Sequence, residues 1–148
     1  MKQTKLINKM KQKNKTGISA VAHYSPNFIR SSTDIEDLIN KDLEPKLVSG
    51  SIERLTGIVK RHISAEDEYN STLAIKACRI MFEKDKIDPN SIDLLIFAST
   101  GQDILEPATA HIVQAEIGTH CKQVMDVKNA CNSFLNALEI AVAFVERS

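Results

Sequence analysis

The sequence has 148 residues, about the length of one ordinary domain. Nineteen basic and nineteen acidic side chains cancel, so the charge gives no support for nucleic-acid or membrane-surface binding. Hydrophobic residues make up 43% of the chain, which is enough for a core, and no apolar run is long enough to span a bilayer. We therefore expect a globular protein with no nucleic-acid partner and no membrane span.

Six lysines and no acid precede Gly17, where the pattern of a folded domain begins. The run predicts a solvated, disordered extension over residues 1–16. It lacks the continuous apolar stretch of a signal peptide. The alternative is a contact surface for an acidic carrier protein or for a membrane. The lysines are Lys2, Lys5, Lys9, Lys11, Lys13 and Lys15.

From residue 17 onward, strand and helix patterns alternate, which predicts an α/β fold. Residues 18–23 favour a strand, and residues 34–39 favour a helix opened by Ser32-Thr33. A longer helix is predicted over residues 71–83. The sequence Asp88-Pro89-Asn90-Ser91 that follows is typical of a turn.

The second half of the sequence continues the alternation. The apolar run 94–98 is typical of a buried parallel strand, and residues 123–127 predict a second, short strand. Pro107 begins a helical pattern that runs through Ile117 and closes at Gly118, with proline first and glycine last. The last helix is predicted to bury an apolar stripe of period near 3.6, formed by Phe134, Leu135, Leu138, Ala141, Val142 and Val145.

Cys131 lies where the strand of residues 123–127 ends and the last helix begins. N–H groups and the positive end of the helix dipole meet at such a junction, and both favour a thiolate that attacks at neutral pH. The junction also lies at the carboxyl edge of the predicted sheet, where open α/β folds usually bind ligands. Spacing alone leaves open that Cys131 is a buried structural cysteine.

The three cysteines fit neither a disulfide framework nor a zinc site, so we expect no metal and a reducing, cytoplasmic location. Cys78 falls on the apolar side of the helix over 71–83 and is expected in the core. Cys121 follows His120 in a turn. Adjacent residues of an extended chain point to opposite faces, so this pair is not expected to act as a catalytic dyad.

Several separated patches share their order and spacing with one protein family. They are Leu55-Thr56-Gly57-Ile58 with Arg61-His62-Ile63, Ile92 to Thr100, Pro107-Ala108-Thr109-Ala110, and Asn129-Ala130-Cys131 through Ala137-Leu138. Together they resemble the N-terminal half of the β-ketoacyl synthase III branch of the thiolase superfamily. The resemblance covers Gly57 to Val145 and extends, with fewer matching patches, back to Gly17. It implies the first half, over residues 17–148, of a duplicated αβαβα layered fold.

The resemblance also implies roles for two residues. Cys131 matches the cysteine that takes an acyl group from a thioester before a carbanion attacks the acyl-enzyme. Leu105-Glu106-Pro107 looks like the acidic loop of thiolases that join two long acyl chains head to head, in which the glutamate lies near the partner subunit's active site. Glu106 is then a candidate base, provided that it is held within hydrogen-bond reach of the proton. An acid favoured by the start of a helix is the alternative.

Binding of the acyl donor is less clearly marked. Housekeeping synthases carry a tryptophan and an arginine around the Thr-Gly-Ile patch that help to hold the CoA adenine. This chain has no tryptophan, and Arg54 stands one place earlier than the family pattern puts it. Arg54, Lys60 and Arg61 are the nearest basic candidates, with solvated surface charge as the alternative. The resemblance implies acyl-CoA or an acyl carrier protein as the donor, which is a substrate, and no cofactor is expected.

The family's catalytic histidine lies in the second half of the fold, beyond the last residue of this sequence. We therefore expect this chain alone to be inactive in condensation, and its apolar face toward the other half to be exposed. The function implied is Claisen condensation through an acyl-cysteine in a homodimer. The alternatives are a head-to-head long-chain acyl-CoA thiolase and a non-catalytic half that serves as an assembly partner. Structural or surface roles are expected for His23, His62, His111 and His120.

Overall fold

The computed structural model describes residues 16–147, and strands and helices alternate along them. The lysine-rich extension predicted at the N-terminus falls, up to residue 15, outside the described residues. The elements in chain order are β1 (Phe28–Ser31), α2 (Ser32–Ile39), α3 (Ser51–Thr56), β2 (Lys60–Ile63), α4 (Asn70–Asp85), the 3-10 helix η1 (Pro89–Ser91), β3 (Leu94–Ala98), α5 (Thr109–Ile117), β4 (Gln123–Val127) and α6 (Ser133–Arg147).

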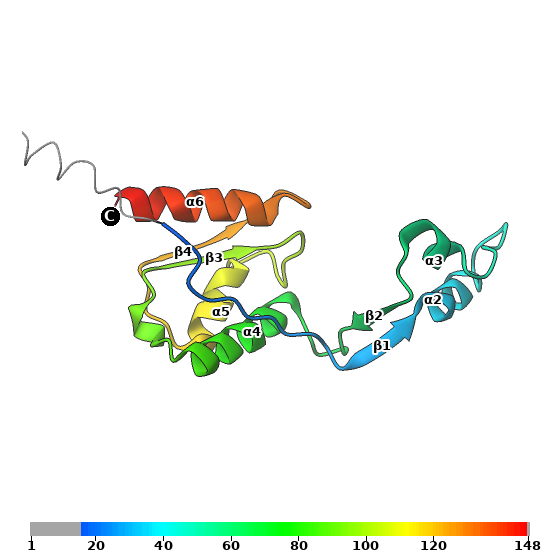
Figure 1. Cartoon of the computed structure of the whole chain (residues 1–148), viewed down its shortest axis with the longest axis horizontal. Coiled ribbons are helices and arrows are strands. Elements are labelled where there is room, and N and C mark those ends of the chain that lie inside the picture. The colour runs from blue at the N-terminus through cyan, green and yellow to red at the C-terminus, as the bar shows by residue number, and fades with distance from the viewer. Residues whose placement is uncertain (1–15, 148) are drawn as a thin grey trace, which may run out of the picture.

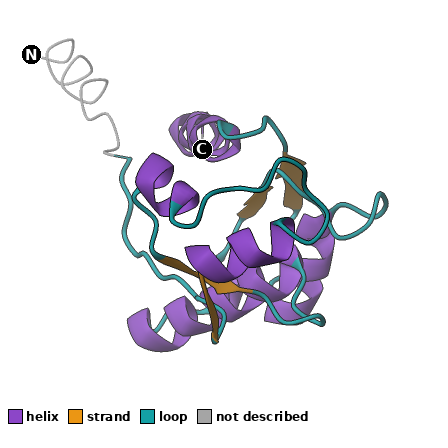
Figure 2. Ribbon diagram, turned by 90° about the vertical axis from the view of Figure 1, so that its right-hand side faces the viewer, coloured by secondary structure: helices purple, strands orange, loops and turns teal. Residues whose placement is uncertain are grey.

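Three layers form the larger part of the molecule. β3 and β4 pair in parallel, with Ala98 opposite Val127 at their carboxyl ends. Helix α6 lies on one face of these strands, while α5 contacts them on the other face and α4 packs against α5 (Figure 1). Figure 2, in which α6 is seen nearly end-on, shows the same order of layers. This α/β/α arrangement agrees with the layered half-fold that the resemblance implies.

The core lies between α4, α5 and the sheet. Its buried members are Ile75 of α4 and Val113 and Ile117 of α5. Burying one such side chain contributes about 1.5–3 kcal/mol to folding. Partly buried apolar side chains pack around them, and Cys78 is among these, as predicted. The set is Ala74, Cys78, Phe82, Leu95 and Phe97.

A second unit, which we call the arm, extends to one side of the layers (Figure 1). It consists of the antiparallel pair β1–β2 and the short helices α2 and α3. Glu36 of α2 is 1% exposed, and its carboxylate accepts the backbone N–H groups of Gly50 (2.7 Å) and Ile52 (2.6 Å) at the start of α3. A buried carboxylate thus holds the two helices of the arm together.

The predicted strand over residues 18–23 is wrong. These residues are described, but they form no strand, and Ile18 and Val21 are 67% and 70% exposed. A strand is defined by pairing, and none of the described strands pairs with this segment; the chain is held just after it, at Tyr24. Tyr24 donates its hydroxyl to Glu68 (2.7 Å), and Lys76 of α4 donates to both of them.

The helix predicted to begin at Pro107 begins two residues further along the chain. Its first helical residue is Thr109, after Ala108, whose backbone is not helical (φ −53°, ψ 140°), because Asp126 of β4 accepts the N–H groups of Thr109 (2.9 Å) and Ala110 (2.8 Å). A carboxylate at this position fixes where a helix starts. The C-terminal end is as predicted, since Gly118 closes α5 with φ of 71°.

The stripe on α6 is buried only in part, which corrects the prediction. Leu138, Ala141 and Val142 are half-buried, whereas Phe134, Leu135 and Val145 are 64%, 60% and 49% exposed. Two strands make a sheet too narrow to cover a stripe of this width. The exposed side chains agree with the expected apolar face.

Other predicted elements are confirmed. The strand over 94–98 and the strand over 123–127 have the predicted limits, and the helix predicted over 71–83 runs from Asn70 to Asp85. The helix predicted over 34–39 begins earlier, at Ser32, where Ser31 accepts the N–H of Asp34. Within residues 16–147, no helix has the length and apolarity needed to cross a membrane.

Candidate active site

Cys131 lies in the turn between β4 and α6, as the sequence predicts. β4 ends at Val127, and α6 begins at Ser133, two residues after the cysteine. Cys131 is a free thiol and is exposed. The alternative of a buried structural cysteine is therefore wrong, because the residue is exposed to solvent.

The turn is fixed from inside by Ser133, which is 4% exposed. Its hydroxyl accepts the N–H of Asn129 (2.9 Å) and lies 2.8 Å from the carbonyl oxygen of Ala130 and 3.2 Å from that of Ser99. The N–H groups of Asn132 and Ser133 bond to the carbonyls of Asn129 and Ala130. These two N–H groups at the helix start, which we expected near the thiol, are thus used by the turn itself.

Ala130 has φ of 45°, in the left-handed region that residues other than glycine rarely adopt. The residue directly precedes Cys131, so this backbone conformation sets the direction in which the thiol leaves the turn. Such conformations persist where the surrounding structure holds them in place. The bonds made by Ser133 supply part of that support.

Glu106 lies in the loop from residue 99 to 108, between β3 and α5. Because β3 and β4 are parallel, this loop and the turn that carries Cys131 leave the sheet at the same edge. Glu106 is exposed, as are its neighbours Leu105 (83%) and Ile104 (48%). No hydrogen bond of the described residues joins Glu106 to the turn, and the glutamate does not begin α5, which removes the alternative of a helix-start acid.

The same loop is anchored at its base by Asp103. Both carboxylate oxygens of Asp103 accept the N–H of Ser71, at 3.2 Å, in the first turn of α4. On the other side, Lys128 donates to the side-chain oxygen of Gln102 at 3.3 Å. The loop that presents Glu106 is therefore tied both to α4 and to the segment that follows β4.

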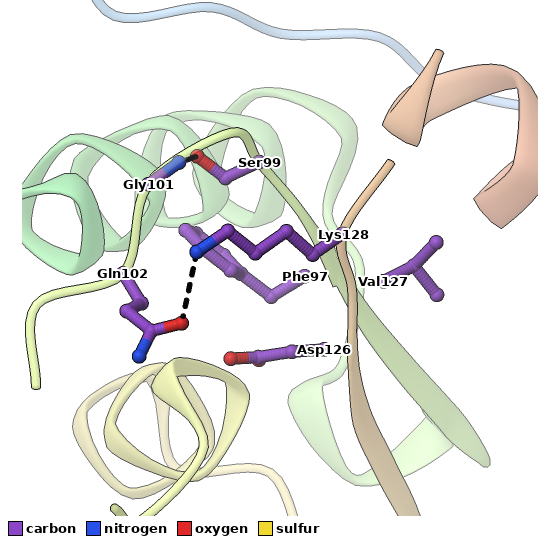
Figure 3. Close-up of a pocket in the computed structure, with 7 residues that line it drawn as sticks. All are labelled: Phe97, Ser99, Gly101, Gln102, Asp126, Val127 and Lys128. Atoms are coloured by element: carbon purple, nitrogen blue, oxygen red, sulfur yellow. Dashed lines mark hydrogen bonds between the residues drawn. The ribbon is translucent and has the colours of Figure 1, made fainter. Parts of the chain in front are cut away.

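A small cavity lies between this loop and the sheet edge (Figure 3). Its volume is about 30 Å³, which is room for a water molecule or two and far too small for an acyl chain. In Figure 3, Lys128 reaches across the cavity to Gln102, and Asp126 lies below them. The lining residues are Phe97, Ser99, Gly101, Gln102, Asp126, Val127 and Lys128.

The basic candidates for CoA binding lie on the arm, apart from the layers that carry Cys131. Arg54 is exposed in α3 and bonds to Ser51 (3.3 Å), while Arg61 of β2 bonds to Ser32 (3.3 Å). Lys60 is exposed at the start of β2. The structure thus brings Cys131 and the Glu106 loop to one edge of the sheet and leaves the arginines on a separate unit.

The remaining cysteines and histidines behave as the sequence predicts. Burial raises the pKa of the Cys78 thiol, which makes it a weaker nucleophile at neutral pH. Cys121 is 7% exposed, whereas its neighbour His120 is exposed. His23, His62 and His111 are also exposed.

Sequence reasoning missed three residues that shape the site, namely Asp103, Asp126 and Ser133. Asp126 did carry a signal, because an acid inside an otherwise apolar strand needs hydrogen-bond partners when it is half-buried. For Asp103 and Ser133 no local pattern marks the role, since their partners lie on other segments or depend on the turn conformation.

Comparison with known proteins gives a consistent result. No protein-family model matches the chain. The chain is 34% identical over 128 residues to the β-ketoacyl-[acyl-carrier-protein] synthase III of a Sulfurovum species, covering 86% of this chain and 36% of that protein. It is 36% identical over 124 residues to the synthase III of Thiobacillus denitrificans, covering 83% and 37%. The chain thus spans well under half the length of these relatives.

Solved structures show the same likeness. The synthase III of Thermus thermophilus superposes with a TM-score of 0.78 at 32% identity, covering 89% of this chain and 39% of that one. Cerulenin-bound OleA of Xanthomonas campestris superposes with a TM-score of 0.79 at 30% identity, covering 88% and 41%. The layered fold, the cysteine turn at the sheet edge and these similarities together place the chain in the thiolase superfamily, as an N-terminal half of the β-ketoacyl synthase III type.

Proposed function

We propose that this chain is the acyl-accepting part of a condensing enzyme that joins two acyl thioesters by Claisen condensation. The observation that carries the proposal is the exposed free thiol of Cys131, on a braced turn at the carboxyl edge of a parallel sheet. The similarity to β-ketoacyl synthase III proteins supports the same assignment. The donor proposed is acyl-CoA or an acyl carrier protein.

The chemistry of the first step is thioester exchange. The thiolate of Cys131 attacks the carbonyl carbon of the donor, and a new carbon–sulfur bond forms as the bond to the donor sulfur breaks. The released thiolate of CoA or of the carrier protein takes up a proton. The second half-reaction, in which a carbanion attacks the acyl-cysteine, uses groups of the family's second half to support the developing negative charge.

Intact-mass measurement of the 148-residue chain tests this step. After incubation with acetyl-CoA, a long-chain acyl-CoA or an acyl carrier protein, we expect one acyl group per chain, bound at Cys131. The adduct should be absent in Cys131→Ala and present in the matched variant Cys121→Ala, whose thiol is buried. Absence of a Cys131-dependent adduct with all three donors would overturn the proposal.

A head-to-head long-chain acyl-CoA thiolase is the second candidate. It is supported by the similarity to OleA and by the acidic loop, which presents an exposed Glu106 at the same edge of the sheet as Cys131. Under this alternative Glu106 removes a proton α to the second thioester. We then expect the long-chain donor to acylate the chain and acetyl-CoA not to.

Exchange of the α-protons of acyl-CoA in deuterated water tests the base directly, by mass spectrometry of the recovered acyl-CoA. Exchange should be lost in Glu106→Gln and kept in Glu116→Gln, a control on the exposed side of α5. Equal exchange in the two variants would count against Glu106.

Assembly belongs to the same proposal. We propose a homodimer in a reducing cytoplasm, supported by three free thiols and by the exposed apolar side chains of α6 and of the Glu106 loop. Sedimentation equilibrium should give the mass of two chains. A chain that assembles but takes no acyl group would instead be the non-catalytic assembly partner.

A further inference from the structure

Three asparagine amides surround the turn that carries Cys131. Asn129 and Asn132 flank the Ala130-Cys131 pair in the sequence, and Asn136 lies one helical turn further on, in α6. The side-chain oxygen of Asn136 accepts an N–H from the amide of Asn129 at 2.7 Å and one from the amide of Asn132 at 3.4 Å. One acceptor on the helix thus binds both ends of the turn.

This amide cluster, defined as Asn129, Asn132 and Asn136, complements Ser133. Ser133 is buried and binds the backbone on the inner side of the turn. Asn136 is half-buried and binds the side chains on the outer side, which face solvent. The turn is therefore held from two sides by residues of the first helical turn of α6.

The turn needs such support because of Ala130. With φ of 45°, Ala130 is in the left-handed conformation, which brings its Cβ too close to the backbone carbonyl oxygen that follows. If the support were removed, Ala130 would relax toward an ordinary conformation, and the thiol of the next residue would change direction. The thiol itself would stay chemically intact and exposed.

We propose that Asn136 is a positioning residue for Cys131, which sets the direction of the thiol by holding the left-handed turn closed. The inference rests on the proposed role of Cys131 as acyl acceptor. Attack on a thioester carbonyl requires a defined angle and distance, and misplacement by about 1 Å can cost as much as about a hundredfold in rate. Alkylation by a small haloacetamide is far less demanding of the geometry.

The test compares two rates on the same thiol. Both acylation by acyl-CoA and alkylation by iodoacetamide require the thiolate, so their ratio cancels any change in thiolate fraction. We expect the ratio to fall by about tenfold in Asn136→Ala. It should stay within about twofold of wild type in Glu139→Ala, a control at an exposed position on the same helix. Asn136→Asp keeps an acceptor for both amides and should restore the ratio.

Hydrogen exchange of backbone amides provides a second measurement that does not depend on acyl transfer. The N–H groups of Asn132 and Ser133 close the turn by bonding to Asn129 and Ala130. We expect their exchange to accelerate about tenfold in Asn136→Ala, and to return to the wild-type rate in Asn136→Asp. Thermal stability should change by no more than it does in the Glu139 control.

The outcomes separate the two proposals. Unchanged exchange and an unchanged ratio in Asn136→Ala would overturn the positioning role, as would an Asn136→Asp variant that behaves like Asn136→Ala. If wild type accepts no acyl group from any donor, the proposed function fails. The hydrogen-exchange measurement alone then decides whether Asn136 holds the turn.

Discussion

Asp126 offers the sharpest test of how the candidate site is built. Its two carboxylate oxygens accept the N–H groups of Thr109 (2.9 Å) and Ala110 (2.8 Å), two residues that are both 0% exposed. In Asp126→Ala these N–H groups lose their acceptors and cannot be reached by bulk water. Replacement by alanine should therefore remove two charge-assisted hydrogen bonds at once.

The magnitude follows from these contacts. A hydrogen bond to a charged group contributes about 1.5–3 kcal/mol, and the lower end applies here because Asp126 is half-buried. Two such bonds give a loss of about 3 kcal/mol in the free energy of unfolding for Asp126→Ala. Asp126→Asn keeps one acceptor oxygen and should lose about half of that. At this chain length, the larger loss corresponds to a Tm lower by about 9 °C.

Urea unfolding followed by far-ultraviolet circular dichroism compares Asp126→Ala and Asp126→Asn with wild type, and Asp93→Ala serves as the control. Asp93 is exposed at the opposite edge of the sheet and should change stability by less than about 0.5 kcal/mol. If Asp126→Ala unfolded at the wild-type urea concentration, or if Asp126→Asn were as destabilised as Asp126→Ala, the assigned role as a two-bond acceptor would be refuted.

Three further predictions concern Glu36 of the arm, the ion pair between Glu68 and Lys76, and the thiols. Glu36→Ala should lower the free energy of unfolding by about 2–4 kcal/mol, measured by urea titration, because two N–H groups lose a buried acceptor; an unaltered titration would contradict this. The hydrogen bond from Lys76 is the largest cause that lowers the pKa of Glu68 from 4.5 to about 2. The stability that Glu68 contributes is therefore complete above pH 4.5 and is lost as the pH falls toward 2, whereas a Lys76→Met variant should show a weaker acid dependence in the same unfolding series. Iodoacetamide at pH 8 should label Cys131 well before Cys78, whose pKa is raised by burial, and peptide mapping that found the reverse order would contradict the exposures described.

The elements that the sequence predicts best are those decided by local pattern. The five consecutive apolar residues of β3 are typical of a strand, which the structure shows half-buried, and Gly118 marks the end of α5 because it can adopt a positive φ without strain. The cysteine turn was also predictable, since a strand pattern stops at Val127 and a helical stripe starts a few residues later.

The predictions that failed concern segments whose pairing partners lie far away in the sequence. The segment 18–23 has a strand-like composition, yet a strand exists only where another one pairs with it. The β1–β2 pair was not predicted, because each strand has only four residues and the two are separated by the helices of the arm. At the candidate site, Cys131 and the edge location were predictable, whereas the contacts of Ser133 and Asn136 were not, because they exist only once the turn has formed.

The carboxylates at the starts of α3, α4 and α5 share a property that matters for how the molecule comes together. Glu36, Asp103 and Asp126 each reach their helix from a position 14 to 32 residues away in the chain. A synthetic peptide that covers any one of these helices would lack the acceptor at its first turn and should be mostly non-helical in water. The order of these three helices is consequently a product of tertiary assembly, and excised segments are poor substitutes for the intact chain.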